Sequence, residues 1–161
     1  MFRQAILISG LLWAATAPAV AAGSPDTTIQ ITLGGQEDSP RQITVAEVES
    51  AGLQQVNAYN PYDRNTDAYT GVWMKDFVAK FGSAETTSMT IRAIDDYEID
   101  FDKMEWQTMR ILIATRVDGA YIDFDKKGPM RIIFPDFDET LEEYQTKLPK
   151  WIWMITEISM D

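Results

Sequence analysis

The residues that could do chemistry in this 161-residue chain are carboxylates, tyrosines, lysines, arginines and hydroxyl side chains, because the sequence has neither cysteine nor histidine. The chain can therefore form no Ser–His–Asp triad and no cysteine nucleophile, and it lacks the ligands of the usual zinc and thiolate metal sites. Carboxylates could still hold calcium or magnesium, but no stretch matches an EF-hand loop. Any site must be built from the remaining side chains.

The stretch 111–135 is where the sequence most clearly offers a place for such a site. Two apolar runs, 111–114 and 132–134, flank a polar segment, and their β-branched residues and flanking turn residues predict buried strands. Gly128 allows a left-handed or closely approaching backbone, and Pro129 forces an extended entry into the second run. Loops between core strands are common positions for functional side chains.

The rest of the chain reads as short strands and short helices. Strands are predicted over 28–33, 41–43, 54–59, 88–94, 98–101 and 151–160. Helices are predicted over 45–50, where Thr44 and Glu47 form a capping box, and over 74–81, with Gly82 at C′. We expect a polar loop over 60–69, a helical turn followed by a loop over 102–109, and an acidic, partly helical loop over 136–149. Because the elements do not alternate regularly as βαβ units, a mixed α+β domain is expected.

Residues 1–22 differ in character from the rest. Arg3 precedes an apolar run over 5–15, and small residues follow as far as Ala21 and Ala22. This layout predicts a signal peptide cleaved after one of those alanines, leaving 23–161 as a single domain without a membrane-inserted segment. An uncleaved anchor is the alternative, although the apolar run is short for a bilayer span. The net charge of −11 argues against nucleic acid and anionic membranes as partners.

Four stretches carry a family resemblance. Residues 69–77 (YTGVWMKDF), 91–97 (IRAIDDY), 113–135 and 150–153 (KWIW) resemble, in order and spacing, segments of the sulfite-oxidase-type molybdopterin-binding domain. The resemblance implies that domain's mixed α+β fold, with short helices around β-sheets. Catalytic members hold molybdenum through a cysteine after the strand that corresponds to 54–59, where this chain has Asn60-Pro61-Tyr62. Molybdenum is therefore not expected, and a molybdopterin-dependent oxidoreductase with an atypical, non-cysteine metal site is kept as an alternative.

Within that family, the chain resembles the small, exported, cysteine-less periplasmic pterin-binding proteins, which are PruR-like. This resemblance implies a non-catalytic periplasmic protein that binds a metal-free, reduced pterin. It further implies a partner, the periplasmic domain of a membrane diguanylate cyclase/phosphodiesterase, and hence a role in cyclic-di-GMP signalling and biofilm regulation. A ligand-free periplasmic adaptor is the other alternative.

A pterin site needs an aromatic face, a carboxylate that accepts two parallel N–H groups, and a donor for the ligand's carbonyl. Asp95 or Asp96 could supply the carboxylate, and a closely approaching backbone or a cation could supply the donor. Tyr97 aligns with a tyrosine that faces the metal site in the catalytic family. The candidate binding residues are Tyr62, Asp95, Asp96, Tyr97, Gly128, Arg131, Lys150 and Trp151.

Each candidate also has a purely structural interpretation. The two aspartates could be turn formers, Trp151 or Trp153 could belong to the core, Lys150 could be solvated, and Arg131 could pair with an acidic neighbour. The acidic run 136–143 is either a solvated face or a docking patch for a basic partner domain.

Overall fold

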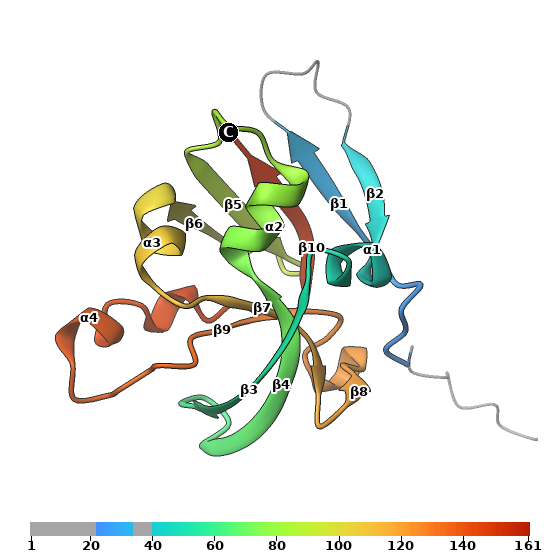
Figure 1. Ribbon diagram of the computed structural model, residues 1–161. Helices are drawn as coiled ribbons and strands as arrows, with labels where there is room; N and C mark the ends of the chain where they lie inside the picture. The colour runs from blue at the N-terminus through green and yellow to red at the C-terminus, as the bar shows by residue number, and fades with distance from the viewer. Residues whose placement is uncertain (1–21, 34–39) are drawn as a thin grey trace, which may run out of the picture.

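The computed structural model describes residues 22–33 and 40–161, which form two β-sheets with short helices around them (Figure 1). The predicted signal peptide, except for its last residue Ala22, lies outside the described residues. The first sheet has the order β2-β1-β10-β5-β6, and the second has the order β3-β4-β7-β8 with β9 also paired to β7. Among the described residues, no helix is both long and apolar enough to cross a membrane.

The strands of the first sheet are β1 (Thr28–Leu33), β2 (Arg41–Thr44), β5 (Ser88–Ala93), β6 (Glu98–Asp102) and β10 (Ile155–Met160). Those of the second are β3 (Leu53–Asn60), β4 (Asn65–Trp73), β7 (Leu112–Val117), β8 (Ala120–Tyr121) and β9 (Arg131–Ile133). The pair β1–β10 is parallel, and the other pairs are antiparallel. This mixture of strands and short helices confirms the predicted α+β class.

The helices are α1 (Val45–Glu49), α2 (Met74–Phe81), α3 (Lys103–Thr108) and α4 (Glu142–Gln145), with 3₁₀ turns η1 (Phe124–Lys126) and η2 (Leu148–Lys150). The predicted capping box is confirmed, because Glu47 N–H donates to Thr44 Oγ1 at 3.1 Å and Thr44 N–H donates to Glu47 Oε2 at 2.7 Å. A second box joins Asp102 to Glu105 and makes most of the predicted turn-and-loop at 102–109 a helix.

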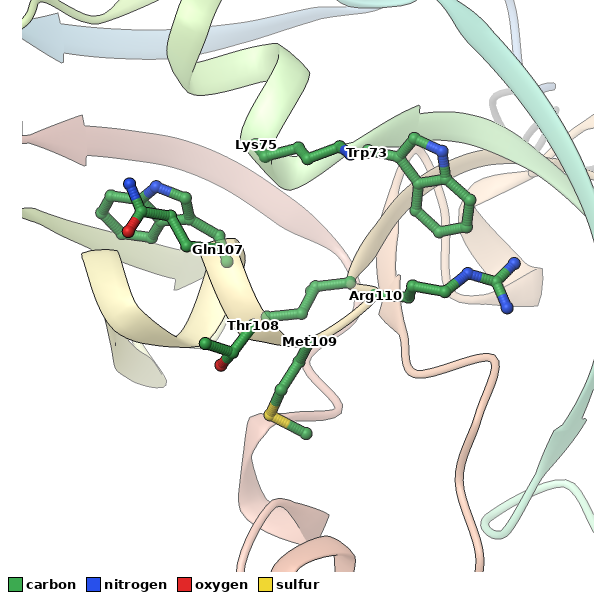
Figure 2. Close-up of a pocket in the computed structure, with 8 residues that line it drawn as sticks. Trp73, Lys75, Gln107, Thr108, Met109 and Arg110 are labelled. Carbon is green, nitrogen blue, oxygen red and sulfur yellow. The ribbon is translucent and has the colours of Figure 1, made fainter.

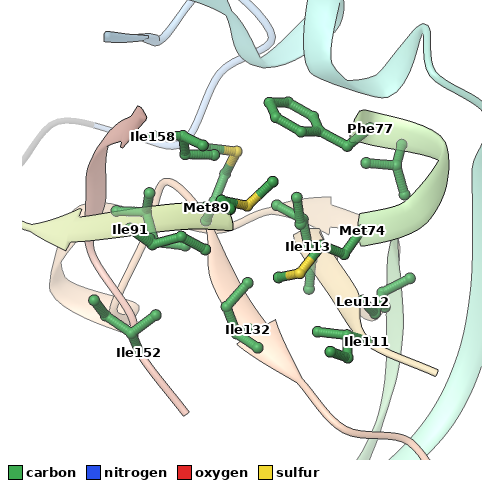
Figure 3. Packing of buried hydrophobic residues seen from close by; sticks show 14 of the residues in the cluster. Met74, Phe77, Met89, Ile91, Ile111, Leu112, Ile113, Ile132, Ile152 and Ile158 are labelled. Atoms are coloured by element: carbon green, nitrogen blue, oxygen red, sulfur yellow. The ribbon is translucent and has the colours of Figure 1, made fainter. Parts of the chain in front are cut away.

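The hydrophobic core lies where α2 and strands of both sheets meet. Figure 3 shows Met74 and Phe77 of α2 facing isoleucines and methionines of β5, β7, β9 and β10. The apolar run 111–114 is almost fully excluded from solvent, which confirms its predicted burial. Burial of this surface is the main force that holds the sheets and α2 together.

Two predictions about elements were wrong. In the expected loop 60–69, Asn60 ends β3, residues 61–64 form a turn and residues 65–69 begin β4, which pairs with the whole of β3. Its polar residues tolerate a strand because that strand is only partly buried and gains its stability from ladder pairing. The predicted strand 151–160 begins at Ile155 instead, because Met154 adopts a positive φ of 56° and the backbone before it follows η2.

Candidate ligand-binding site

One pocket gathers half of the predicted binding residues. It has a volume of about 250 Å³. Its lining residues are Tyr62, Ala93, Asp95, Tyr97, Pro149, Trp151, Ile152 and Trp153. They come from the β3–β4 turn, the β5–β6 turn, η2 and the segment before β10, so segments distant in sequence meet here.

The two pocket tyrosines are held by consecutive backbone carbonyls. Tyr62 Oη donates to the Leu148 carbonyl at 2.8 Å, and Tyr97 Oη donates to the Pro149 carbonyl at 2.9 Å. The Tyr62 ring also packs edge-on against Trp153, with 5.4 Å between ring centroids. Burial, together with the nearby Tyr97, raises the pKa of Tyr62, which keeps its hydroxyl protonated as a donor. The aromatic walls are therefore fixed by hydrogen bonds at their outer ends.

The turn that carries Tyr62 is built around Asn60. This residue is buried, and its Oδ1 accepts hydrogen bonds from the backbone N–H groups of Tyr62 at 2.9 Å and Asp63 at 3.3 Å. Its Nδ2 donates to Asp63 Oδ2 at 3.0 Å. Asn60 therefore acts as a local turn former at the start of the β3–β4 turn.

Asp95 and Trp151 line the pocket, where Asp95 brings a carboxylate side chain and Trp151 brings an indole ring whose N–H is buried. Asp95 is exposed in the β5–β6 turn, where its Oδ1 accepts from the Tyr97 N–H at 3.3 Å. Trp151 is 3% exposed and packs against Phe134 and Phe137. Its Nε1 has no hydrogen-bond partner among the described residues. A buried donor without an acceptor is costly, so a ligand that accepts from this indole would gain affinity.

Asp96, which the sequence analysis grouped with Asp95, does not line this pocket. It adopts a positive φ of 64° at the turn and lines a separate hollow beside Arg92 and Gln42. Asp95 is therefore the carboxylate that the structure places in the pocket.

Lys150 is also placed outside the pocket, because Glu105 captures its ammonium group. Lys150 Nζ lies 2.8 and 2.7 Å from the two carboxylate oxygens of Glu105 and 2.6 Å from the Asp100 carbonyl. Lys147 Nζ lies 2.5 Å from Glu105 Oε1. Burial opposes ionisation of Glu105, but hydrogen bonds from both lysines outweigh it and hold its pKa below the usual value. This cluster anchors η2, whose carbonyls position the tyrosines.

Gly128 and Arg131 likewise have structural roles outside the pocket. A Cβ on Gly128 would lie 1.9 Å from the Ile122 carbonyl oxygen, which confirms the predicted close approach, whereas the left-handed residue is Lys127, with a φ of 68°. Arg131 is buried, and its guanidinium lies 3.0 Å from Asp63 Oδ2 and donates to the Lys126 carbonyl at 2.9 Å. Arg131 therefore pairs with an acidic neighbour, Asp63, which is the structural alternative given for it in the sequence analysis.

A second pocket of about 210 Å³ lies on another part of the surface, next to α3 (Figure 2). The Arg110 guanidinium lies 4.9 Å from the centre of the Trp73 ring and pairs with Asp136 at 2.7 Å. None of the eight predicted residues lines it. Trp73 and Trp106 line this pocket together with the cations Lys75 and Arg110 and the end of α3, but no carboxylate lines it.

Trp153 and Pro149 complete the first pocket in ways that the candidate set did not include. The predicted strand 151–160 would place Trp153 and Trp151 on one face of a sheet. The backbone at 151–154 is irregular instead, and both tryptophans line the pocket. Pro149 contributes through its carbonyl, a group that side-chain patterns do not reveal. Across the described residues, no group of three or more Asp and Glu side chains is arranged to hold a metal ion.

Comparison with known proteins identifies the fold. No family model matches the chain, and no curated protein matches it. Among solved structures, it is similar to the sulfane dehydrogenase SoxCD from Paracoccus pantotrophus, with a TM-score of 0.59 and 13% identity. The match covers 84% of this chain and 38% of that chain, so this chain spans much less than the length of its neighbour. At this identity the likeness shows the fold alone, and the chain has the mixed α+β fold of the sulfite-oxidase type.

Proposed function

We propose that the pocket between Tyr62 and Tyr97 binds a metal-free pterin and that the protein is a non-catalytic, exported pterin-binding regulator. One observation carries this proposal. Aromatic rings line a pocket that has one carboxylate and one buried, unpartnered indole N–H, in a chain without cysteine. Flat heterocycles are recognised by such a combination of aromatic surface and hydrogen bonds to their edges.

Each group in the pocket has a counterpart on a pterin. The carboxylate of Asp95 suits the adjacent amide and amino N–H groups, because a carboxylate accepts two parallel hydrogen bonds. The Trp151 N–H suits an acceptor such as the ring carbonyl. Tyr62, Tyr97 and Trp153 supply aromatic surface, and the two tyrosines lose little freedom on binding because Leu148 and Pro149 already hold their hydroxyls.

The residues present do not fit a molybdenum centre. The resembled catalytic domain needs a thiolate after the strand that corresponds to 54–59, and this chain has Asn60-Pro61-Tyr62 there, with the Asn60 side chain committed to the β3–β4 turn. The described residues also bring together no cluster of carboxylates to replace it. A binding role therefore agrees better with this donor set than the oxidoreductase alternative.

The acidic segment that leads into η2 supports the proposed partner. Asp138, Glu139, Glu142 and Glu143 are exposed, and Leu141 among them is 44% exposed. This segment continues into η2, whose carbonyls position both pocket tyrosines. We propose that a basic surface on the periplasmic domain of a membrane diguanylate cyclase/phosphodiesterase docks here, where it can sense the state of the pocket.

The decisive experiment compares two neighbouring aspartates. Asp95→Asn keeps the turn hydrogen bond but removes the carboxylate charge, and Asp96→Asn makes the same chemical change outside the pocket. Isothermal titration under anaerobic conditions with reduced neopterin- and monapterin-type ligands should show binding to the wild type. Because a hydrogen bond to a charged group contributes roughly 1.5–3 kcal/mol, Asp95→Asn should weaken binding about 10- to 100-fold. Asp96→Asn should leave it unchanged.

Three results would redirect the proposal. Flat titrations with every pterin would remove the pterin proposal and favour a ligand-free adaptor, for which partner capture should not respond to pterin. Equal weakening in both variants would mean that the pocket described above is not the site. Stoichiometric molybdenum in protein purified from a cofactor-producing host would favour the oxidoreductase alternative.

A further inference from the structure

The outer edge of β3 is an unpaired strand edge. β3 pairs with β4 over eight residues, from Leu53 opposite Val72 to Asn60 opposite Asn65, and no described strand lies on its other side. Figure 1 shows the two strands running together from the helices to the hairpin turn. In such a pair, every second residue directs its backbone N–H and C=O away from the partner strand. Within the described chain, no hydrogen bond joins the backbone of residues 53–59 to any element except β4.

This edge also lacks the features that normally prevent strands from pairing with other molecules. Its sequence, LQQVNAYN, contains no charged residue and no proline, although 24% of the chain is charged. Exposed edges are usually protected by charges, proline, bulges or short length. The other edges follow this rule, because β6 carries three acidic residues, β2 begins with Arg41, and β8 has two residues. β3 is therefore the sheet edge best suited to accept another strand.

We propose that a second copy of this chain pairs with the edge, β3 against β3 in antiparallel orientation, about a twofold axis at Val56. From Gln55 onwards the side chains of β3 alternate, with Gln55, Asn57 and Tyr59 exposed and Val56, Ala58 and Asn60 at least partly covered. Leu53 and Gln54 at the start of the strand are both exposed, and Leu53 lies on the same face as Gln55. Directly opposed residues in an antiparallel pair share a face of the sheet. The axis must therefore pass through a residue position, so that exposed residues meet exposed residues.

The register centred on Val56 makes this strand complementary to itself. It places Leu53 opposite Tyr59 of the second copy and Gln55 opposite Asn57, and symmetry forms each pair twice. Leu53 and Tyr59 are 45% and 40% exposed, and in this register each covers the other. Aromatic–aliphatic cross-strand pairs stabilise sheets, and the two amide side chains can bond to each other. A register centred on Asn57 would leave Leu53 without an opposite residue in the strand. No like charges meet, so the chain's net charge does not act directly at this edge.

Charge substitutions test both the pairing and its register. Gln55→Lys together with Asn57→Lys places like charges opposite each other twice, and Gln55→Lys together with Asn57→Asp places opposite charges there. Sedimentation analysis of the purified protein should show a wild-type dimer at micromolar concentration. The dissociation constant of the dimer should be about tenfold higher for the dilysine variant than for the wild type. For the lysine–aspartate variant it should be close to the wild-type value. Because both altered residues are exposed, the fold itself should be unchanged.

A single cysteine provides a second test, since the chain has none of its own. Val56→Cys would place two thiols on directly opposed residues, whose Cα atoms would lie about 5 Å apart, within disulfide range. Leu53→Cys is the matched control, because its symmetry mate would lie six residues along the strand, roughly 20 Å away. Mild oxidation should cross-link the first variant and not the second.

Three outcomes would overturn the proposal. A protein that stays monomeric at every concentration would refute the β3–β3 dimer, and the edge would then suit only a strand of a different protein. Equal dissociation of the dilysine and lysine–aspartate variants would refute the Val56 register, as would equal cross-linking of the two cysteine variants. None of these measurements involves a pterin, so they separate this proposal from the proposed function.

Discussion

Replacing Glu105 with glutamine should destabilise the protein and release the segment that holds the pocket tyrosines. Glu105 is 8% exposed and accepts hydrogen bonds from two lysine ammonium groups and from the Asp102 N–H. Hydrogen bonds to charged groups each contribute roughly 1.5–3 kcal/mol. Glutamine keeps one oxygen acceptor, and the side chains of Lys147 and Lys150 are already 21% and 24% exposed and can turn towards water. We therefore expect the free energy of unfolding to fall by about 2–3 kcal/mol.

The pH dependence gives this prediction a second, independent signature. Burial opposes ionisation of Glu105, but hydrogen bonds from Lys147 and Lys150 prevail and hold its pKa below the ordinary 4.5. A carboxyl with a lowered folded-state pKa stabilises the protein fully above its unfolded-state pKa, and this stabilisation is lost as pH falls through the folded-state value. The difference between wild type and Glu105→Gln should therefore be constant above about pH 5.5 and shrink in more acidic solution.

Urea unfolding followed by tryptophan fluorescence, repeated from neutral to acidic pH, measures both effects. Glu143→Gln is the matched control, because Glu143 is an exposed glutamate in the nearby α4 helix, and it should change the unfolding free energy by less than about 0.5 kcal/mol. If both variants have the same urea midpoint, Glu105 does not anchor η2. If the Glu105→Gln difference stays constant into strong acid, the charged hydrogen bonds are not its source.

Two further substitutions test the packing that supports the site. Gly128→Ala should lower the unfolding free energy by about 2–3 kcal/mol, because the new Cβ would overlap the Ile122 backbone. At Gly119 a Cβ would meet open space but the φ is 83°, so Gly119→Ala should lower the unfolding free energy by only about 1 kcal/mol. Equal urea midpoints for the two glycine variants would contradict the close approach. Phe77→Ala removes a fully buried ring from α2 and should cost about 3–5 kcal/mol in the same assay, and a cost under about 1 kcal/mol would contradict its place in the core.

Local sequence signals predicted the elements that local interactions determine. The Thr44–Glu47 capping box places the start of α1, and the β-branched run at 111–114 gives the buried start of β7. The strand β4 was missed because its polar residues carry no alternation of buried and exposed positions, and its stability comes from pairing with β3. The segment before β10 was wrongly predicted as strand because its residues were assigned an alternating pattern through 151–156, whereas here Trp151 packs against Phe134 and both tryptophans line a pocket.

Local sequence signals also could not predict which of the candidate residues line the pocket. Asp95 and Asp96 are adjacent and chemically identical, yet Asp95 lines the pocket and Asp96 lines a separate hollow. Lys150 and Arg131 are bound by Glu105 and Asp63, carboxylates that lie 45 and 68 residues away in the sequence. Residue type therefore predicted the kinds of groups that a pterin site would need. Which of these side chains remain available to a ligand depends on the residues that folding places beside them, and these cannot be read from the sequence.

The β3–β4 hairpin connects the two proposed binding surfaces. Its outer edge offers backbone groups to a second copy, and its turn carries Tyr62 into the pocket. Asn60 bonds the turn internally, and the Tyr62 hydroxyl bonds to Leu148, so the ring is positioned by contacts within one chain. A strand added at the edge would restrain the hairpin without touching these contacts. The proposed ligand binding and the proposed dimerisation would therefore depend on different atoms, because Asp95 lies in the β5–β6 turn whereas Gln55 and Asn57 lie on β3. The Asp95 and Gln55/Asn57 variants can thus test the two proposals separately.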